Sequence, residues 1–317
     1  MPTTERRRLG PAELVQLTAV ARRFHLDGRS KIQIGEELGL SRFKVARLLE
    51  RAHSEGLVTI QIGRPAEIDT DLSEAVRLRL GYEHVVVADL DDDEPAVLRH
   101  QISRLAADHL AEVVEPGDVV GIAWGRSLLD LAAQLTELPP CSAVQLCGAL
   151  ARSDVDASTV DVTRKVAEAS GGSAVTFYAP LLVPDAGAAT ALRREALVAR
   201  AHSHYRRLSV AVISVGAWGT GLSTVYDALG ERERRSLARA GATAETCGVV
   251  FDRDGAPLDP GLRSRVIGVG PADLRRTRSV LTLAYDARKA DAVRAVKAGG
   301  IGTSLVTHTA LARRLLA

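Results

Sequence analysis

Hydrophobic residues recur with a helical period through the amino-terminal part of the chain. Between Pro11 and Asp27 they stand three and four residues apart, which predicts one amphipathic helix that ends before Gly28. A second helix is predicted for KIQIGEEL at 31–38, where Ser30 can act as the cap. The third predicted helix is SRFKVARLLERAHSEG, with Ser41 as its cap. The pattern therefore predicts three short helices in succession.

The junction between the second and third helices carries several signals at once. Gly35 is a small residue where two helices must cross closely, and Gly39, four positions later, permits a left-handed turn. The third helix has an apolar stripe that we expect to point inward, made of Val45, Leu48, Leu49 and Ala52. This spacing predicts a helix-turn-helix. Periodicity alone also fits a plain three-helix bundle whose arginines keep it soluble.

The start of the third helix carries the residues that we expect to read DNA. Recognition helices contact base edges from their first turns, and here the candidates are Ser41, Arg42, Phe43 and Arg47. Arginine can pair with guanine through two hydrogen bonds, and phenylalanine can pack on a thymine methyl group. Phosphate contacts are expected from Gln33, Lys44 and Arg51. The predicted partner is operator double-stranded DNA.

Charge is distributed unevenly along the chain. Up to Arg64 there are 12 Lys plus Arg against 7 Asp plus Glu, whereas the remainder holds 29 against 32. A small basic module on a mildly acidic body suits a DNA reader joined to another domain, although ordinary surface charge gives the same bias. The alternating stretch LVTIQI at 57–62 predicts one strand of a wing, before Gly63 and Pro65 break the pattern. We expect a DNA-binding domain at 1–64 and an effector-binding domain at 65–317.

From Asp71 onward, short apolar runs alternate with helical segments, which is typical of a parallel sheet with crossover helices. Helices are predicted at 70–80, 97–113 and 127–136. Strands are predicted at 84–88, 118–124, 143–150, 208–216, 266–270, 279–285 and 303–307. The predicted fold class is α/β, with a doubly wound, Rossmann-like sheet in the second domain.

Two connections in this domain have the chemistry of an anion site. In GIAWGRSLLDLAAQL a strand runs into Gly125, Arg126 and Ser127 and a helix begins at once, so free N–H groups and a hydroxyl can surround a phosphate. The glycine can equally serve only the turn, and the serine only the cap. In AYDARKADAVRAVKAGG, Lys289 stands in the first turn of a predicted helix, where a cation needs an anionic partner. That partner is either Asp286 or a ligand phosphate.

Composition argues against several other classes of protein. Hydrophobic residues make up 46% and charged residues 25% of the 317 residues, as in ordinary soluble proteins, and no apolar run approaches the roughly 20 residues of a membrane span. The amino terminus does not resemble a secretory signal. Three scattered cysteines suit neither a disulfide framework nor a zinc site. We expect a cytoplasmic protein with no metal or other cofactor.

The run SKIQIGEELGLSRFKVARLLERAHSEGLVTIQI resembles the amino-terminal module of the SorC/DeoR-type sugar-binding transcriptional regulators. GIAWGRSLLDLA is similar to that family's GxxWGxTL element, which places Gly125 and Ser127 on its glycine and hydroxyl positions and Arg126 between them. Further similar segments surround Gly148, Gly219 and Glu245. The resemblance implies a sugar phosphate or related effector, and dimers or tetramers that bind palindromic operators.

The sequence also departs from the family pattern. Tyr285 and Asp286 precede Lys289 where two glycines are usual, and Glu245 stands where aspartate is usual. Thr307, His308 and Thr309 replace a threonine followed by acidic residues. An added acid near the anion site also fits a less charged effector such as a free polyol.

Two other functions stay open at this point. The α/β domain also resembles sugar-phosphate isomerases and deaminases, whose acid–base chemistry would have to come from Asp227, Glu245, Asp286, Lys289 or His308. No recognisable catalytic spacing joins them, and we expect no enzyme activity. Alternatively, the domain binds no ligand and only oligomerises. The leading prediction is a transcriptional regulator of carbohydrate metabolism or uptake, controlled by a small carbohydrate.

Overall fold

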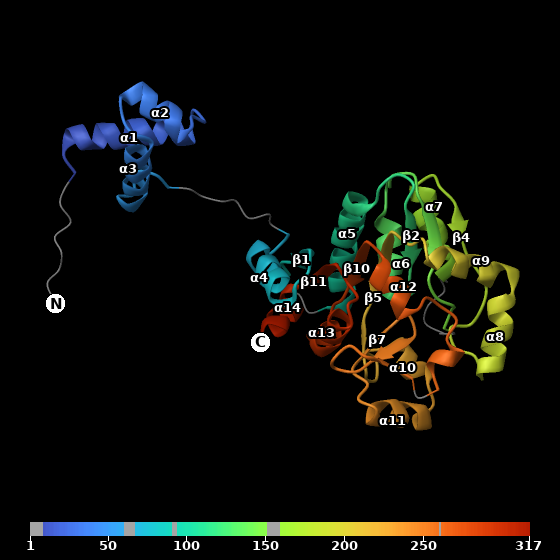
Figure 1. Cartoon of the computed structure of the whole chain (residues 1–317). Helices are drawn as coiled ribbons and strands as arrows, with labels where there is room; N and C mark the ends of the chain where they lie inside the picture. Colours follow the sequence, from blue (N-terminus) through green and yellow to red (C-terminus); the bar gives the residue numbers. More distant parts are fainter. Residues whose placement is uncertain (1–8, 60–66, 91–93, 151–158, 260) are drawn as a thin grey trace. The chain divides into compact units, whose positions relative to one another are not determined.

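A computed structural model of the chain describes residues 9–59, 67–90, 94–150, 159–259 and 261–317. By its internal contacts the chain divides into two units, Met1–Gly63 and Arg64–Ala317 (Figure 1). The division falls one residue before the boundary expected from the sequence. Each unit has a hydrophobic core of its own.

The first unit consists of three helices among the residues described. They are α1 (Pro11–His25), α2 (Lys31–Leu38) and α3 (Arg42–Ser54), and all three were predicted. Leu17 and Val20 of α1, Ile34 of α2 and Val45 of α3 are fully buried against one another. The helical periods in the sequence therefore arise from one shared core.

The turn between α2 and α3 has the geometry that the sequence predicts. Gly39 adopts a left-handed conformation with φ of 65°. A Cβ atom at Gly35 would lie 2.5 Å from the Leu40 carbonyl oxygen, so only glycine fits there. Residues 57–59 contain no strand, and residues 60–62 of the predicted wing lie outside the described residues.

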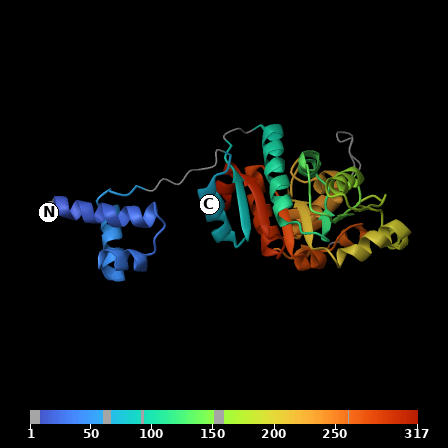
Figure 2. The same cartoon turned by 90° about the horizontal axis from the view of Figure 1, so that it is seen from above.

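The second unit is built on a parallel seven-stranded sheet. Its strands are β1 (His84–Ala88), β2 (Val119–Ile122), β3 (Ser142–Gln145), β4 (Ala174–Val175), β5 (Val210–Ser214), β10 (Ser279–Leu283) and β11 (Ser304–His308). Their order across the sheet is β1-β11-β10-β5-β2-β3-β4. Most of these strands are continuous apolar runs because helices cover both faces of the sheet (Figure 2). The predicted α/β class is confirmed.

The order of strands reverses direction between β2 and β5. From β2 the chain moves outward to β3 and β4, then returns to β5 on the other side of β2 and continues through β10 to β11. Val120 of β2 lies in register with Val210 of β5. A crevice opens at such a reversal, because the connections on its two sides leave in opposite directions.

Helices of the second unit connect the strands and cover the sheet. They are α4 (Thr70–Leu80), α5 (Pro95–Val113), α6 (Arg126–Gln134), α7 (Thr159–Ala169), α8 (Ala186–Arg194), α9 (Ala196–Tyr205), α12 (Pro271–Arg276), α13 (Ala290–Ala298) and α14 (Thr309–Leu316). Short 3-10 helices occupy Arg263–Arg265 and Ala287–Lys289. The three helices predicted at 70–80, 97–113 and 127–136 correspond to α4, α5 and α6.

A second, smaller sheet was not predicted. It pairs β6 (Gly216–Ala217), β7 (Ala244–Thr246), β8 (Val249–Phe251) and β9 (Pro257–Leu258) in antiparallel order, and α10 (Thr224–Ala228) and α11 (Glu231–Arg239) lie between β6 and β7 in sequence. The predicted strand at 266–270 was wrong. This segment makes only isolated bridges, from Val266 to Leu182 and from Gly268 to Cys147, so its apolar pattern reflects burial and not membership of a sheet.

Candidate functional site

The exposed face of α3 is defined by how the helix is capped and packed. The Ser41 hydroxyl accepts a hydrogen bond from the Lys44 amide at 3.2 Å, which starts the helix at Arg42. Val45 and Leu48 face the core of the unit. The helix consequently turns its remaining face to solvent.

Four of the predicted DNA contacts lie on this face. Arg42, Lys44 and Arg47 are exposed, and none of them forms an ion pair with the described acidic residues. Phe43 is 73% exposed, which is unusual for a phenylalanine in a small domain with its own core. The face therefore presents three uncompensated positive charges around one exposed aromatic ring.

The other predicted DNA contacts also serve the fold. Arg51 Nη1 lies 2.5 Å from Glu13 Oε1, so its charge is compensated by α1. The Gln33 side chain accepts a hydrogen bond from the Ser30 amide and completes the cap of α2. Arg51 has to give up or share its ion pair to bind a phosphate.

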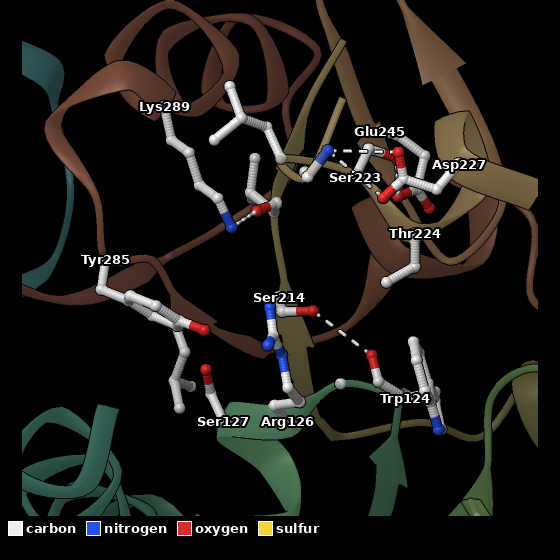
Figure 3. A pocket seen from close by; sticks show the side chains of 16 residues that line it. Trp124, Arg126, Ser127, Ser214, Ser223, Thr224, Asp227, Glu245, Tyr285 and Lys289 are labelled. Atoms are coloured by element: carbon white, nitrogen blue, oxygen red, sulfur yellow. Dashed lines mark hydrogen bonds between the residues drawn. The ribbon is translucent and has the colours of Figure 1, made fainter. Parts of the chain in front are cut away.

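A cavity of about 280 Å³ opens at the reversal of strand order in the second unit. Its walls come from the loop after β2, the end of β5, the segment after β10, and the α10 region (Figure 3). Segments far apart in sequence thus meet beyond the carboxyl ends of neighbouring parallel strands. In open α/β sheets this is where ligands bind.

One end of the cavity is formed by the start of α6. Gly125 occupies the cap position of this helix and brings no side chain to satisfy its first N–H groups. The Ser127 side chain forms no hydrogen bond with the described residues, and Arg126 is exposed at the same helix start. Gly125 packs against β5, since a Cβ atom there would lie 2.9 Å from Ser214 Oγ. Unused donors and a cation are gathered at this end.

Lys289 adds a second cation to the cavity. Its Nζ donates a hydrogen bond to the Val215 carbonyl oxygen at 3.0 Å. Burial lowers the pKa of Lys289 to about 8, even though Asp286 and Glu245 act in the opposite direction. The lysine is thus only partly compensated by its surroundings.

The opposite side of the cavity is acidic. Glu245 of β7 is buried, and it accepts hydrogen bonds from the Gly248 amide at 2.8 Å and from Ser223 Oγ at 3.2 Å. Burial raises the pKa of this carboxyl group. Asp227 of α10 accepts a hydrogen bond from the Gly221 amide at 3.1 Å. Figure 3 shows Asp227, Glu245 and Ser223 grouped on one side, away from Arg126 and Ser127.

The structure brings together five of the eight predicted effector contacts. Gly125, Arg126, Ser127, Glu245 and Lys289 line the cavity.

The other three predicted contacts lie elsewhere. Gly148 lines a side cavity of about 30 Å³ that shares Glu245 with the main one, while Gly219 lines neither of the two. Asp286 is turned away from the cavity lining, and its carboxylate pairs with Arg288 at 2.5 Å and accepts the Arg288 amide at 2.9 Å. Asp286 has φ of 83°, a backbone conformation that favours glycine. Asp286 and His308 were both considered as possible acid–base residues, but neither of them lines the cavity.

Several cavity residues were missed by the sequence analysis. Ser214 ends β5, while Ser223 and Thr224 begin α10. The aromatic side chains Trp124 and Tyr285 also line the cavity. A polar residue at the end of an apolar strand, as in VAVIS, was the available signal for Ser214. The α10 residues gave none, because a helix of five residues shows no period.

Three further features of the described residues bear on their chemistry. Within them, no group of three or more His, Cys, Asp or Glu is arranged to hold a metal ion. None of the helices described is both long enough and apolar enough to cross a membrane. Cys141, Cys147 and Cys247 are buried free thiols.

Fold and cavity together define a two-unit protein, with a small basic helical unit and an α/β unit of the ligand-binding type. Residues 64–317 match the Sugar-bind family of sugar-binding domains. The chain belongs to this family, and with it to the SorC/DeoR-type sugar-binding transcriptional regulators.

Known proteins can be aligned with this chain over nearly its whole length. The deoxyribonucleoside regulator of Bacillus subtilis is 25% identical over 93% of this chain and 95% of its own length. The transcriptional regulator LsrR of Klebsiella pneumoniae is 27% identical over 98% of this chain and 95% of its own. The crystal structure of the full-length sorbitol operon regulator SorC from Klebsiella pneumoniae has a similar fold, with a TM-score of 0.74 and 20% identity over 96% of this chain and 100% of that one.

Proposed function

We propose that the chain is a DNA-binding transcriptional regulator that responds to a sugar phosphate and controls genes of carbohydrate metabolism or uptake. The observation that carries this proposal is the division of one cavity into a cationic end and an acidic side. A phosphate group suits the first and sugar hydroxyl groups suit the second. A free polyol would use only the acidic side.

The cationic end supports phosphate binding. The start of α6 offers N–H groups and the Ser127 hydroxyl, and Arg126 and Lys289 supply charge. A phosphate placed there would also relieve the cost of keeping Lys289 charged in a buried position.

The acidic side supports binding of a carbohydrate. Carboxylate groups such as Asp227 accept hydrogen bonds from hydroxyl groups, and Ser223 and Thr224 can donate or accept them. Glu245 is held in place by Gly248 and Ser223, so its orientation is set before a ligand arrives.

The helix-turn-helix formed by α2 and α3 is proposed to read the operator. Arg42, Phe43 and Arg47 would contact base edges and Lys44 a phosphate, because these side chains are exposed at the start of α3. The two sequence relatives reported above are named as regulators, which supports a regulatory function for this chain and not an enzymatic one.

Effector binding is proposed to change how two or more copies of the chain are arranged, and thereby the spacing of their α3 helices on a palindromic operator. This requires the effector to bind one arrangement more tightly than the other. Light scattering on the operator complex should give the mass of a dimer or tetramer. A single copy bound to the operator would contradict this part of the proposal.

The sensor half can be tested by comparing two neighbouring cations. Lys289→Ala removes a charge that lines the cavity, whereas Arg288→Ala removes one outside the cavity. In a thermal-shift screen, sugar phosphates should stabilise both the wild type and Arg288→Ala. The affinity of Lys289→Ala for the same ligands should be about 10-fold to 100-fold lower. Stabilisation by free polyols alone would contradict the phosphorylated effector.

The DNA half can be tested by a similar pair. Arg47→Ala should weaken operator binding by at least about tenfold and leave effector binding intact. Arg235→Ala removes an equal charge from the surface of the other unit and should bind the operator normally. Equal affinity of wild type and Arg47→Ala for the operator would rule out this role for Arg47.

A further inference from the structure

The short helix α10 contributes two residues to the acidic side of the cavity. Thr224 and Asp227 line the cavity, and Figure 3 shows Asp227 on the same side as Glu245. A helix of five residues has too few internal hydrogen bonds to hold its own position, so its place depends on its neighbours. Its beginning is fixed by Ser223, whose hydroxyl accepts the Tyr226 amide at 3.1 Å and donates to Glu245 at 3.2 Å. The end that carries Asp227 needs a separate support.

Arg234 of α11 supports this end of α10, and Figure 1 shows the two helices next to each other. The Arg234 Nη2 donates a hydrogen bond to the Asp227 carbonyl oxygen at 2.8 Å. The guanidinium carbon lies 4.9 Å from the centroid of the Tyr226 ring, which is within the range of a cation–π interaction. Carbonyl groups in the last turn of a helix have no partner in the helix itself. Arg234 therefore holds the backbone of the residue whose carboxylate lines the cavity.

The Tyr226 ring packs in turn against Trp218. The two ring centroids are 5.2 Å apart and the ring planes make an angle of 84°. Trp218 directly follows β6, and its amide donates to the Thr243 carbonyl oxygen at 3.0 Å, next to β7. Arg234, Tyr226 and Trp218 thus form a stack that joins α11, α10 and the small sheet. None of these three residues lines the cavity.

The charge of Arg234 is not compensated by an acidic partner. Arg234 is partly buried and forms no ion pair with the described acidic residues, and its Nε is buried without a hydrogen-bond partner. The neighbouring Arg235, in contrast, is exposed and pairs with Glu231 at 2.6 Å. A partly buried cation without an opposite charge lowers stability, and such exceptions to the usual rules are expected where a residue serves a function.

We propose that Arg234 is a positioning residue for the acidic side of the cavity. Through the backbone of Asp227 it holds α10 so that the Asp227 carboxylate meets the hydroxyl groups of the ligand. The proposal rests on the proposed function, because it assumes that a sugar binds at this side. The cationic end should not depend on the stack, since Arg126 and Lys289 belong to α6 and to the start of α13. Preference for a sugar phosphate over bare phosphate therefore depends on a side chain outside the cavity.

The test compares a sugar phosphate with inorganic phosphate by calorimetric titration of the full chain. The sugar phosphate is the one that stabilises the wild type most in a thermal-shift screen. Arg234→Ala should bind it about tenfold more weakly but bind inorganic phosphate like the wild type, because only the sugar uses the acidic side. Arg234→Met keeps the aliphatic stem over the ring and should show the same split if alanine destabilises the fold. Arg235→Ala is the matched control and should change neither affinity.

Conservative variants separate the contacts of the stack. Arg234→Lys keeps a cation that can donate to the same carbonyl oxygen, so it should recover part of the lost affinity for the sugar phosphate. Tyr226→Phe keeps the ring and should bind like the wild type, whereas Tyr226→Leu should resemble Arg234→Ala.

A double-mutant cycle tests whether Arg234 acts through Asp227. Asp227→Ala alone should weaken binding of the sugar phosphate, and adding Arg234→Ala should cause little further loss. Additive losses would overturn the proposal. Wild-type affinity of Arg234→Ala for the sugar phosphate, or equal losses for both ligands, would overturn it as well.

Failure of the proposed function gives a different result. If the wild type binds no sugar phosphate, or if Lys289→Ala binds it as tightly as the wild type does, the proposed function fails whatever the Arg234 variants show.

Discussion

The ammonium group of Lys289 and the carboxyl group of Glu245 lie in one cavity, and burial acts on both. It lowers the pKa of the lysine to about 8 and raises the pKa of the glutamate, so each charge is less favourable than it would be in water. Buried charged groups lower the stability of the folded protein and are commonly found at binding sites. We infer that these two groups are retained because they bind the ligand.

The pKa of Lys289 predicts how anion binding depends on pH. Below about 8 the free lysine is protonated and attracts an anion, and above this value it loses its charge. Since a phosphate monoester gains its second charge near a pH of about 6, affinity should be highest between these values. It should fall about tenfold over roughly one to two units above pH 8. Calorimetry across pH checks this prediction.

The control for this pH dependence is Lys289→Met, which has no titrating group at the position. Its affinity should be lower throughout and should stay flat above pH 8. A decline of the same size in Lys289→Met would assign the effect to another group.

At the scale of elements, the loop from β2 to α6 is pressed against β5. A Cβ atom at Gly125 would lie 2.9 Å from Ser214 Oγ but 3.5 Å from Ser214 Cβ, so the conflict is with the hydroxyl oxygen alone. Close packing of strand ends at the reversal of strand order therefore fixes the position of the start of α6.

This contact predicts a rescue. Gly125→Ala should displace the start of α6, cost about 1–3 kcal/mol in stability and weaken sugar phosphate binding. Adding Ser214→Ala removes the conflicting oxygen and should restore most of both losses, relative to Ser214→Ala alone. The three variants and the wild type form a double-mutant cycle measured by urea unfolding and calorimetry. Additive losses would show that the two residues do not conflict.

The turn between α2 and α3 gives a second prediction for an element. Gly35→Ala places a methyl group on the Leu40 carbonyl oxygen and should destabilise the first unit by about 1–3 kcal/mol, with loss of operator binding. Glu36→Ala, on the exposed face of α2, is the matched control and should change little. Circular dichroism melting of the full chain measures both. If Gly35→Ala melts and binds the operator like the wild type, α2 and the turn can move apart without loss of stability, and the prediction fails.

Local signals explain which parts could be predicted from the sequence. The Gly125–Ser127 loop and Lys289 each stand at a strand-to-helix junction, where the chemistry is visible within a few residues. Ser223 and Thr224 come from short elements around the small sheet, whose strands are too short to show a period. The segment 266–270 is apolar because it is buried, and burial alone does not distinguish a strand from an extended loop.

At the scale of the whole molecule, the two units differ in charge and therefore suit different kinds of ligand. The first presents uncompensated arginines on α3, which suits a polyanion, and the second encloses both signs of charge in a cavity, which suits a small polar ligand. Regulation requires that the two binding events be coupled, with a coupling free energy of about 1–3 kcal/mol in typical cases.

The most direct test is fluorescence anisotropy of a labelled operator, selected from random duplexes by the full chain, with and without a sugar phosphate that stabilises the chain. The wild type should change its operator affinity at least about fivefold. Lys289→Ala should bind the operator normally but no longer respond, while Arg47→Ala should lose the operator and keep the effector. A wild type whose operator affinity is the same with saturating effector as without it would contradict the account.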